Sequence, residues 1–119
     1  MAHIVVLDDV EDAAVMIKRI LERKGHQVAV FTDEEVALAH VAANPVDLAI
    51  LDIKLKKMSG VEVLEEMRRS SAHIKVIMLT GYPTLETAQE SRRLGASEYC
   101  VKPIDRDELE EKVAAVLAG

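Results

Sequence analysis

The chain has 119 residues, enough for one domain that buries a single core without disulfides or a structural metal. Its formal net charge of -6 and its lack of a lysine- or arginine-rich block argue against direct nucleic-acid binding. It has no apolar stretch of the roughly 20 residues that span a bilayer and no basic N-terminal region. We therefore expect a cytoplasmic protein that does not contact membranes, with residues 1–119 in a single domain and no output domain.

Strands and helices are predicted to alternate five times along the chain. Runs of consecutive β-branched and leucine residues predict buried strands, whereas apolar residues three or four apart, such as Ala13, Ile17 and Leu21, predict helices. In chain order the predicted elements are a strand at 3–8, a helix from 10 to about 24, a strand at 27–31, a helix to about 43, a strand at 46–51, a helix from about 59 to 70, a strand at 74–79, a helix from about 84 to 94, a strand at 97–101 and a helix from about 105 almost to 119.

Short polar motifs predict where these helices begin and end. Gly25 and Gly95 are helix stops, and Asn44-Pro45 ends the second helix. Three pairs have the spacing of a capping box and would open helices: Thr32 with Glu35, Ser59 with Glu62, and Asp105 with Glu108.

The strands are continuous apolar runs, which indicates a sheet covered on both faces. With right-handed crossovers, this pattern predicts an α/β fold with a doubly wound parallel sheet. The one cysteine, Cys100, cannot form an internal disulfide and lies in a predicted strand, so we expect it to be a buried small hydrophobe.

Polar residues follow four of the predicted strands at their carboxyl ends. These ends lie along one edge of an open parallel sheet, which is where ligands bind. Carboxylates, a hydroxyl and an ammonium group would then converge, a combination that suits a divalent cation and a phosphoryl group. The four polar clusters are Asp8-Asp9, Asp52, Thr80-Gly81 and Lys102-Pro103.

The acidic residues are candidate metal ligands. Asp8 and Asp9 near Asp52 would repel one another unless a cation lay among them, and oxygen ligands of this kind suit Mg²⁺. Beside Mg²⁺, Asp52 is a candidate nucleophile toward phosphorus. The alternative is that Asp8 and Asp9 cap the following helix and that Asp52 is a helix cap or a loop acid.

Thr80 and Lys102 are candidate partners of a phosphoryl group. The Thr80 hydroxyl can donate to a phosphoryl oxygen, and Gly81 permits close approach of the backbone. Lys102 supplies a counter-charge, and the Lys102-Pro103 bond is a candidate cis peptide. The alternative for Lys102 is a surface salt bridge to Asp52.

In order and spacing, these clusters resemble the receiver domain of a two-component response regulator along the whole chain. Met58-Ser59-Gly60, Ala96 and Tyr99 extend the resemblance. It implies a CheY-like, flavodoxin-like (βα)5 fold with a five-stranded parallel sheet in the strand order 2-1-3-4-5. It also implies a phosphorylation-dependent switch or relay module rather than a turnover enzyme.

The resemblance assigns roles to individual residues. Asp52 would accept a phosphoryl group from a phosphohistidine on a sensor histidine kinase or a phosphotransfer protein. Asp9, Asp52 and the backbone carbonyl of Lys54 would bind Mg²⁺, for which Mn²⁺ can substitute, and Asp8 would hold a metal-bound water. Lys102 and Thr80 would contact the phosphoryl oxygens.

The resemblance also implies an output mechanism. Thr80 would move toward the phosphoryl group and let Tyr99 turn inward. This motion would change the face formed by the fourth helix, fifth strand and fifth helix, through which the domain would reach an effector or output domain, or form a homodimer.

The sequence departs from the family pattern in one loop. Lys56 stands where many members have proline, so the loop is expected to be looser, and Lys54, Lys56 and Lys57 would crowd the rim of the site. In the family, the side chains at Lys54 and Tyr82 flank the path of the hydrolytic water, and their size predicts slow self-dephosphorylation. Val15 and Met16 are candidate contacts for the histidine-bearing partner.

Three other functions have weaker support. A phosphatase similar to the haloacid-dehalogenase family would need an aspartate where Lys54 stands. A flavodoxin-like flavin carrier would need a phosphate-binding loop in place of the acidic residues 8–12. A receiver-like interaction module that is never phosphorylated would be expected to lack one of the acids or Lys102.

Overall fold

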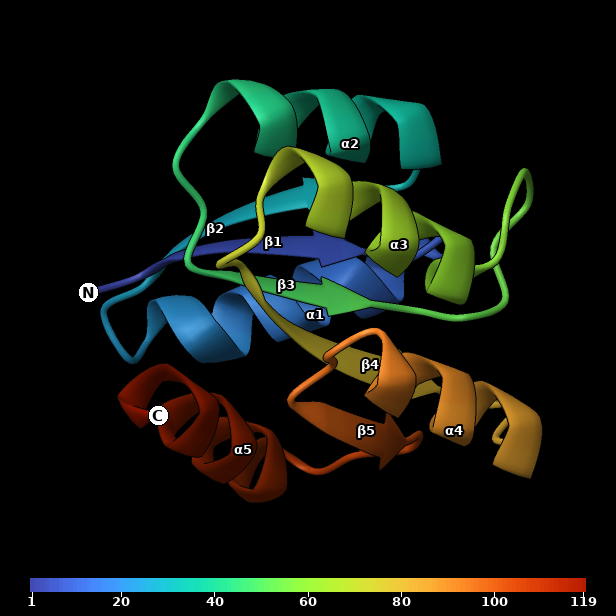
Figure 1. The fold of residues 1–119 in the computed structure, drawn as a ribbon. Coiled ribbons are helices and arrows are strands. Elements are labelled where there is room, and N and C mark those ends of the chain that lie inside the picture. Colours follow the sequence, from blue (N-terminus) through green and yellow to red (C-terminus); the bar gives the residue numbers. More distant parts are fainter.

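The computed structural model describes residues 1–119 as three layers, a parallel sheet between two layers of helices (Figure 1). The sheet has five strands in the order β2-β1-β3-β4-β5, so the predicted doubly wound fold and strand order are confirmed. The elements in chain order are β1 (His3–Leu7), α1 (Glu11–Glu22), β2 (Gln27–Phe31), α2 (Glu34–Ala43), β3 (Leu48–Leu51), α3 (Gly60–Ser70), β4 (Lys75–Thr80), α4 (Leu85–Arg93), β5 (Glu98–Val101) and α5 (Arg106–Ala118).

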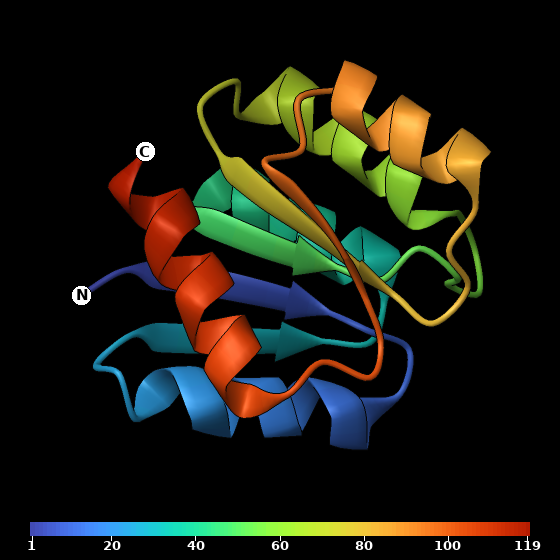
Figure 2. The ribbon, with the colours of Figure 1, turned by 90° about the horizontal axis from the view of Figure 1, so that it is seen from below.

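Each face of the sheet carries its own apolar core. Along β1, Ile4 and Val6 pack with residues of α1 and α5, whereas Val5 and Leu7 pack with residues of α2 and α3. Side chains alternate between faces along a strand, so a strand covered on both sides must be apolar at every position. Figure 2 shows α1 and α5 on the near face of the sheet.

The strand direction determines where functional groups can gather. All neighbouring strands pair in parallel, so their carboxyl ends point to one edge of the sheet, and both chain termini lie at the other edge (Figure 2). The loops after β1, β3, β4 and β5 therefore meet at the first edge.

The helix ends confirm most of the predicted caps. Ser59 accepts a hydrogen bond from the Glu62 amide, and the Glu62 side chain accepts one from the Ser59 amide, which completes the capping box. Gly25 and Gly95 both have φ of 89°, the left-handed conformation that glycine adopts most easily.

Several predicted boundaries differ from those observed: the first strand ends at Leu7 and not at residue 8, the fourth is Lys75–Thr80 and not 74–79, and the fifth begins at Glu98 and not at residue 97. The cap of α2 is Asp33, whose side chain accepts from the Val36 amide at 3.1 Å, and not Thr32. The third strand begins at Leu48 and not at residue 46. Just before it, the Asp47 amide donates to the His3 carbonyl at 2.8 Å, and the Asp47 carboxylate accepts from the His3 amide at 2.8 Å.

Two further expectations have structural outcomes. No helix is long and apolar enough to cross a bilayer. Cys100 is buried and unpaired, as expected, and burial raises the pKa of its thiol.

Candidate functional site

Three carboxylates meet where β1 and β3 end. Asp8, Asp9 and Asp52 have oxygens within 4.8 Å of one another, although β1 and β3 are far apart in the sequence. Asp8 is 2% exposed and Asp52 8% exposed, so both carboxylates have lost most of their hydration. The predicted acidic cluster is therefore present, and two of its three carboxylates are buried.

The alternative role of Asp8 as a helix cap is wrong, because the cap position of α1 is Val10 and no side chain caps this helix. Asp8 Oδ1 accepts from the Val10 amide at 2.9 Å and so satisfies the turn that leads into α1. Its Oδ2 lies 2.6 Å from Lys102 Nζ and faces the acidic cluster. One carboxylate thus stabilises the turn before α1 and contributes to the site.

Lys102 reaches the acidic cluster from the end of β5. Its Nζ lies 2.6 Å from Asp8 Oδ2 and 3.2 Å from Asp52 Oδ2, and its side chain is 26% exposed. The partner atoms are mostly buried, so this is not a simple surface salt bridge. Its peptide bond to Pro103 is cis, as anticipated.

The charges at this site shift two pKa values. Burial raises the pKa of Asp52 and the nearby Asp8 charge adds to the effect, while Lys102 opposes it. Burial would lower the pKa of Lys102, but hydrogen bonds and charges from Asp8 and Asp52 outweigh that effect and raise it. Lys102 is therefore a firmly charged ammonium group, beside a carboxylate that is harder to ionise than usual.

The donor set fits a hard divalent cation. Three carboxylates converge from two loops, and Mg²⁺ is bound in proteins by one or two carboxylates, waters and a phosphate. The Lys54 carbonyl lies two residues beyond Asp52 and accepts no hydrogen bond within the protein, so it is free to serve as a further oxygen ligand.

Thr80 is fully buried at the end of β4. Its hydroxyl accepts from the Tyr82 amide at 3.0 Å, and its carbonyl accepts from the Lys102 amide at 2.8 Å. Gly81 is less constrained than expected, because a Cβ there would meet only Lys102 Cβ, at an ordinary 4.0 Å. Close backbone approach is therefore not the reason for glycine at this position.

Tyr99 is half-buried in β5, beside Met78 of β4. Its hydroxyl lies 2.7 Å from Thr87 Oγ1 and accepts from the Thr84 amide at 3.4 Å. Thr84 is the cap of α4. The sequence interpretation did not single out either threonine, although their spacing is that of a helix cap and the amide it binds.

The lysines after Asp52 do not crowd the site as expected. The Nζ of Lys57 turns away to Asp33 at 2.7 Å and Glu35 at 3.2 Å, both near the start of α2. The Nζ of Lys54 lies 4.1 Å from the centre of the Tyr82 ring, a cation–π contact. Of the three, only Lys56 extends into solvent without a partner.

An apolar groove lies beside Lys102. Met16 on α1 is 56% exposed and Val15 is half-buried, so Met16 is the more available of the two predicted contacts. The groove is lined by Ala13, Met16, Ile17, Ile20, Leu79, Lys102, Pro103, Ile104 and Leu109.

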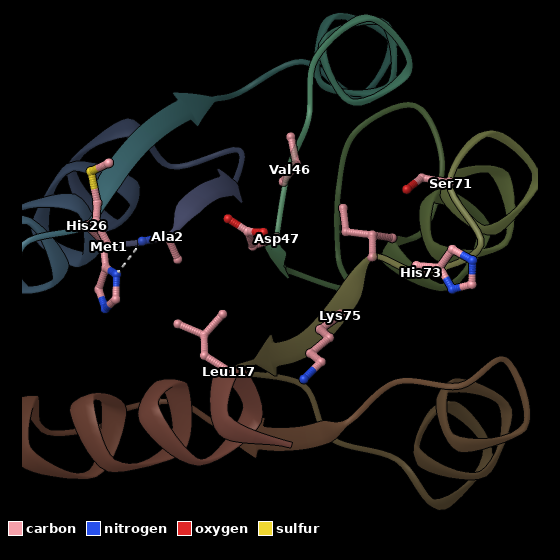
Figure 3. Close-up of a pocket in the computed structure, with 10 residues that line it drawn as sticks. Met1, Ala2, His26, Val46, Asp47, Ser71, His73, Lys75 and Leu117 are labelled. Carbon is pink, nitrogen blue, oxygen red and sulfur yellow. Dashed lines mark hydrogen bonds between the residues drawn. The ribbon is translucent and has the colours of Figure 1, made fainter.

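A separate pocket lies at the opposite edge of the sheet (Figure 3). Its polar groups are largely occupied within the protein: His26 Nδ1 accepts from the Ala2 amide at 3.1 Å, and Lys75 Nζ donates to the Val116 carbonyl at 2.9 Å. The acidic cluster is far from this pocket, at the carboxyl ends of the strands. We therefore take the carboxyl edge as the functional site.

Comparison with known proteins identifies the family. Residues 4–114 match the model of the response regulator receiver domain. The chain is 32% identical to sporulation initiation phosphotransferase F of Bacillus subtilis, over 96% of this chain and 92% of that protein. It is 31% identical to the transcriptional regulatory protein ZraR of Salmonella typhimurium over 97% of this chain, and it spans 26% of that longer protein.

Solved structures agree with this similarity. The CheY-like response regulator receiver domain protein from Methanospirillum hungatei superposes with a TM-score of 0.96, at 34% identity over 99% of this chain and 94% of that one. The chemotaxis protein CheY4 of Vibrio cholerae superposes with a TM-score of 0.91, at 28% identity over 98% of each chain.

Proposed function

The chain belongs to the response regulator receiver domain family of two-component systems, and from this premise we propose that Asp52 accepts a phosphoryl group from a phosphohistidine with the help of Mg²⁺. The observation that carries the proposal is the position of Asp52. Its buried carboxylate shares one site with two other acids and with the ammonium group of Lys102.

The proposed transfer is a displacement at phosphorus. A carboxylate oxygen of Asp52 forms a bond to phosphorus while the bond from phosphorus to the histidine nitrogen breaks, and that electron pair stays on the imidazole. Mg²⁺, held by Asp9, Asp52 and the Lys54 carbonyl, would neutralise the carboxylates and the phosphoryl oxygens. Lys102 favours the ionised form of Asp52 before transfer and can follow the phosphoryl oxygens afterwards, because its Nζ already lies 3.2 Å from Asp52 Oδ2.

Thr80 and Tyr99 would carry the signal away from the site. A phosphoryl group attracts the Thr80 hydroxyl, which would give up the Tyr82 amide that it now accepts from. The space vacated lets Tyr99 turn inward, and its contacts with Thr84 and Thr87 tie that motion to the start of α4. The surface of α4, β5 and α5 would change as a result.

Two surfaces suit the partners of such a module. The apolar groove around Met16 and Ile104 lies next to Lys102 and suits the helices of a histidine kinase or phosphotransfer protein. Leu85 is 74% exposed and Val101 49% exposed, so the α4–β5–α5 face offers apolar contacts for an effector, an output domain or a second phosphorylated copy.

A turnover enzyme is less well supported. Lys54 stands where a phosphatase of the haloacid-dehalogenase type needs a general acid, and its ammonium group lies over the Tyr82 ring. The proposed chemistry is therefore self-phosphorylation from a phosphohistidine donor followed by slow self-dephosphorylation. A flavin carrier is disfavoured by the acids at the end of β1, which would repel a phosphate.

Intact mass spectrometry tests the proposal directly. The parent chain and Asp52→Ala are incubated with acetyl phosphate, with and without Mg²⁺. One phosphoryl adduct is expected on the parent with Mg²⁺ only, and none on Asp52→Ala. An equal adduct on Asp52→Ala would contradict the assignment of the acceptor. If the parent stays unmodified, binding of beryllofluoride with Mg²⁺ distinguishes rapid hydrolysis from an interaction module that is never phosphorylated.

A further inference from the structure

Glu34 is the one carboxylate outside the acidic cluster that is almost fully buried. It is the first residue of α2 and is only 1% exposed. A buried charge is costly unless it is paired or hydrogen-bonded. None of the roles described so far involves this residue.

The contacts of Glu34 are with the loop that follows the proposed phosphoacceptor. Its Oε2 accepts from the Lys57 amide at 2.5 Å and from the Met58 amide at 3.0 Å. Burial would raise the pKa of Glu34, but the hydrogen bonds from these two amides and from the amide of Glu34 itself together outweigh it and lower the pKa. The carboxylate is therefore ionised, and both of these loop amides depend on it.

The neighbours of Glu34 hold the same loop residue by its side chain. Asp33 and Glu35 both pair with Lys57 Nζ. These pairs are largely exposed and contribute little, whereas the buried Glu34 contacts involve a full charge and two amides. Glu34 is thus the strongest connection between α2 and the loop.

The rest of this loop is anchored against Asp52 itself. A Cβ at Gly60 would lie 2.0 Å from the Asp52 carbonyl oxygen, so only glycine fits there, and the Gly60 amide donates to the Ile53 carbonyl at 2.7 Å. Lys56 lies between Asp52 and Gly60, at a position where a proline would restrict the backbone. The Glu34 carboxylate binds the amide of Lys57, the residue directly after Lys56.

We propose that Glu34 is a positioning residue that holds the β3–α3 loop, and with it Asp52 and the Lys54 carbonyl, in the geometry that binds Mg²⁺ and accepts the phosphoryl group. This inference rests on the proposed function. The sequence predicted a loose β3–α3 loop. Under this proposal Glu34 of α2 holds that loop in place.

The test compares Glu34→Gln with Glu35→Gln, the same change at the neighbouring exposed residue. Glutamine can place its carbonyl oxygen where Oε2 accepts from both loop amides, but it lacks the negative charge that strengthens these two hydrogen bonds. For Glu34→Gln we expect faster hydrogen exchange at the Lys57 and Met58 amides, and Mg²⁺ binding weaker by about tenfold, the lower end for residues that orient metal ligands. Phosphorylation by acetyl phosphate should slow with it. Glu35→Gln should match the parent in all three measurements.

A second variant separates positioning from general destabilisation. Lys56→Pro removes no hydrogen bond, because the Lys56 amide donates none within the protein. Added to Glu34→Gln, it should restore most of the Mg²⁺ affinity by restricting the loop, at a temperature where all variants are folded. The inference would be overturned if the parent binds Mg²⁺ and is phosphorylated, and Glu34→Gln matches it in hydrogen exchange, Mg²⁺ affinity and rate of phosphorylation. A parent that does neither would instead contradict the proposed function.

Discussion

The charge balance at the carboxyl edge depends on one ammonium group among three acids. Lys102 lies close to Asp8 and Asp52, and Asp9 completes the cluster. With a single cation among them, the carboxylates repel one another, and burial adds to the cost for Asp52. This arrangement favours the binding of a divalent cation and destabilises the metal-free protein.

Removing the Asp52 charge should therefore stabilise the metal-free protein. The pKa of Asp52 is higher in the folded chain than in the unfolded chain, so its contribution to stability is present at acidic pH and is lost as the pH rises through the folded pKa. Asp52→Asn avoids that loss at neutral pH. We therefore expect Asp52→Asn to have the higher free energy of unfolding at neutral pH without metal.

Urea unfolding in the presence of a chelator measures this gain. The difference between parent and Asp52→Asn should shrink toward pH 4 and below, and saturating Mg²⁺ should reverse it by stabilising the parent. A less stable Asp52→Asn protein at neutral pH without metal would contradict the prediction.

At the scale of elements, local motifs predicted a helix end well where the two residues of the motif hydrogen-bond to each other's backbone amides. Ser59 with Glu62 is such a case. The α2 cap was mispredicted because Thr32, Asp33 and Glu35 all have capping side chains, and the choice depends on where the chain leaves β2. The burial of Glu34 could not be predicted from its neighbours, since its partners lie 23 and 24 residues away in the chain.

The observed cap can be tested against the predicted one. Asp33→Ala removes the acceptor for the Val36 amide and should cost about 1 kcal/mol of unfolding free energy, the usual value for a lost cap. Thr32→Ala should change stability by less than about 0.5 kcal/mol. Lys57→Met controls for loss of the exposed ion pair. Equal effects of the two alanine variants in urea unfolding would argue against Asp33 as the cap.

The loops after β3 and β4 should together control the lifetime of the phosphorylated protein. Lys54 and Tyr82 contact each other, and Tyr82 is 64% exposed at the rim of the site. Replacing both with alanine should open the path of the hydrolytic water and speed dephosphorylation about tenfold, equivalent to about 1.4 kcal/mol of activation free energy. The decay of the phosphoryl adduct in mass spectra measures this rate. Lys56→Ala is the matched control, and an unchanged rate in the double variant would refute the prediction.

At the scale of the molecule, the sequence predicted the fold because a two-sided parallel sheet needs continuous apolar strands. The same topology brings Asp8, Asp52 and Lys102 to one edge, so their meeting was also predictable. What was not predictable were contacts between loops and side-chain directions, such as Lys57 pointing to α2 and Tyr99 bonding to Thr84 and Thr87. Such contacts depend on how closely segments far apart in the sequence approach one another, which no local pattern specifies.

Signal transmission across the molecule should depend on the Thr80 hydroxyl. Thr80 is fully buried between the site and β5, and Thr80→Val keeps its shape while removing the group that would follow the phosphoryl oxygens. With Mg²⁺ and beryllofluoride, the parent should show amide chemical-shift changes both around Asp52 and across α4 and β5. Thr80→Val should keep the changes near Asp52 but lose most of those at Thr84, Thr87 and Tyr99, because a ligand shifts a conformational equilibrium only through differential contacts. A full α4–β5 response in Thr80→Val would show that the signal travels by another route.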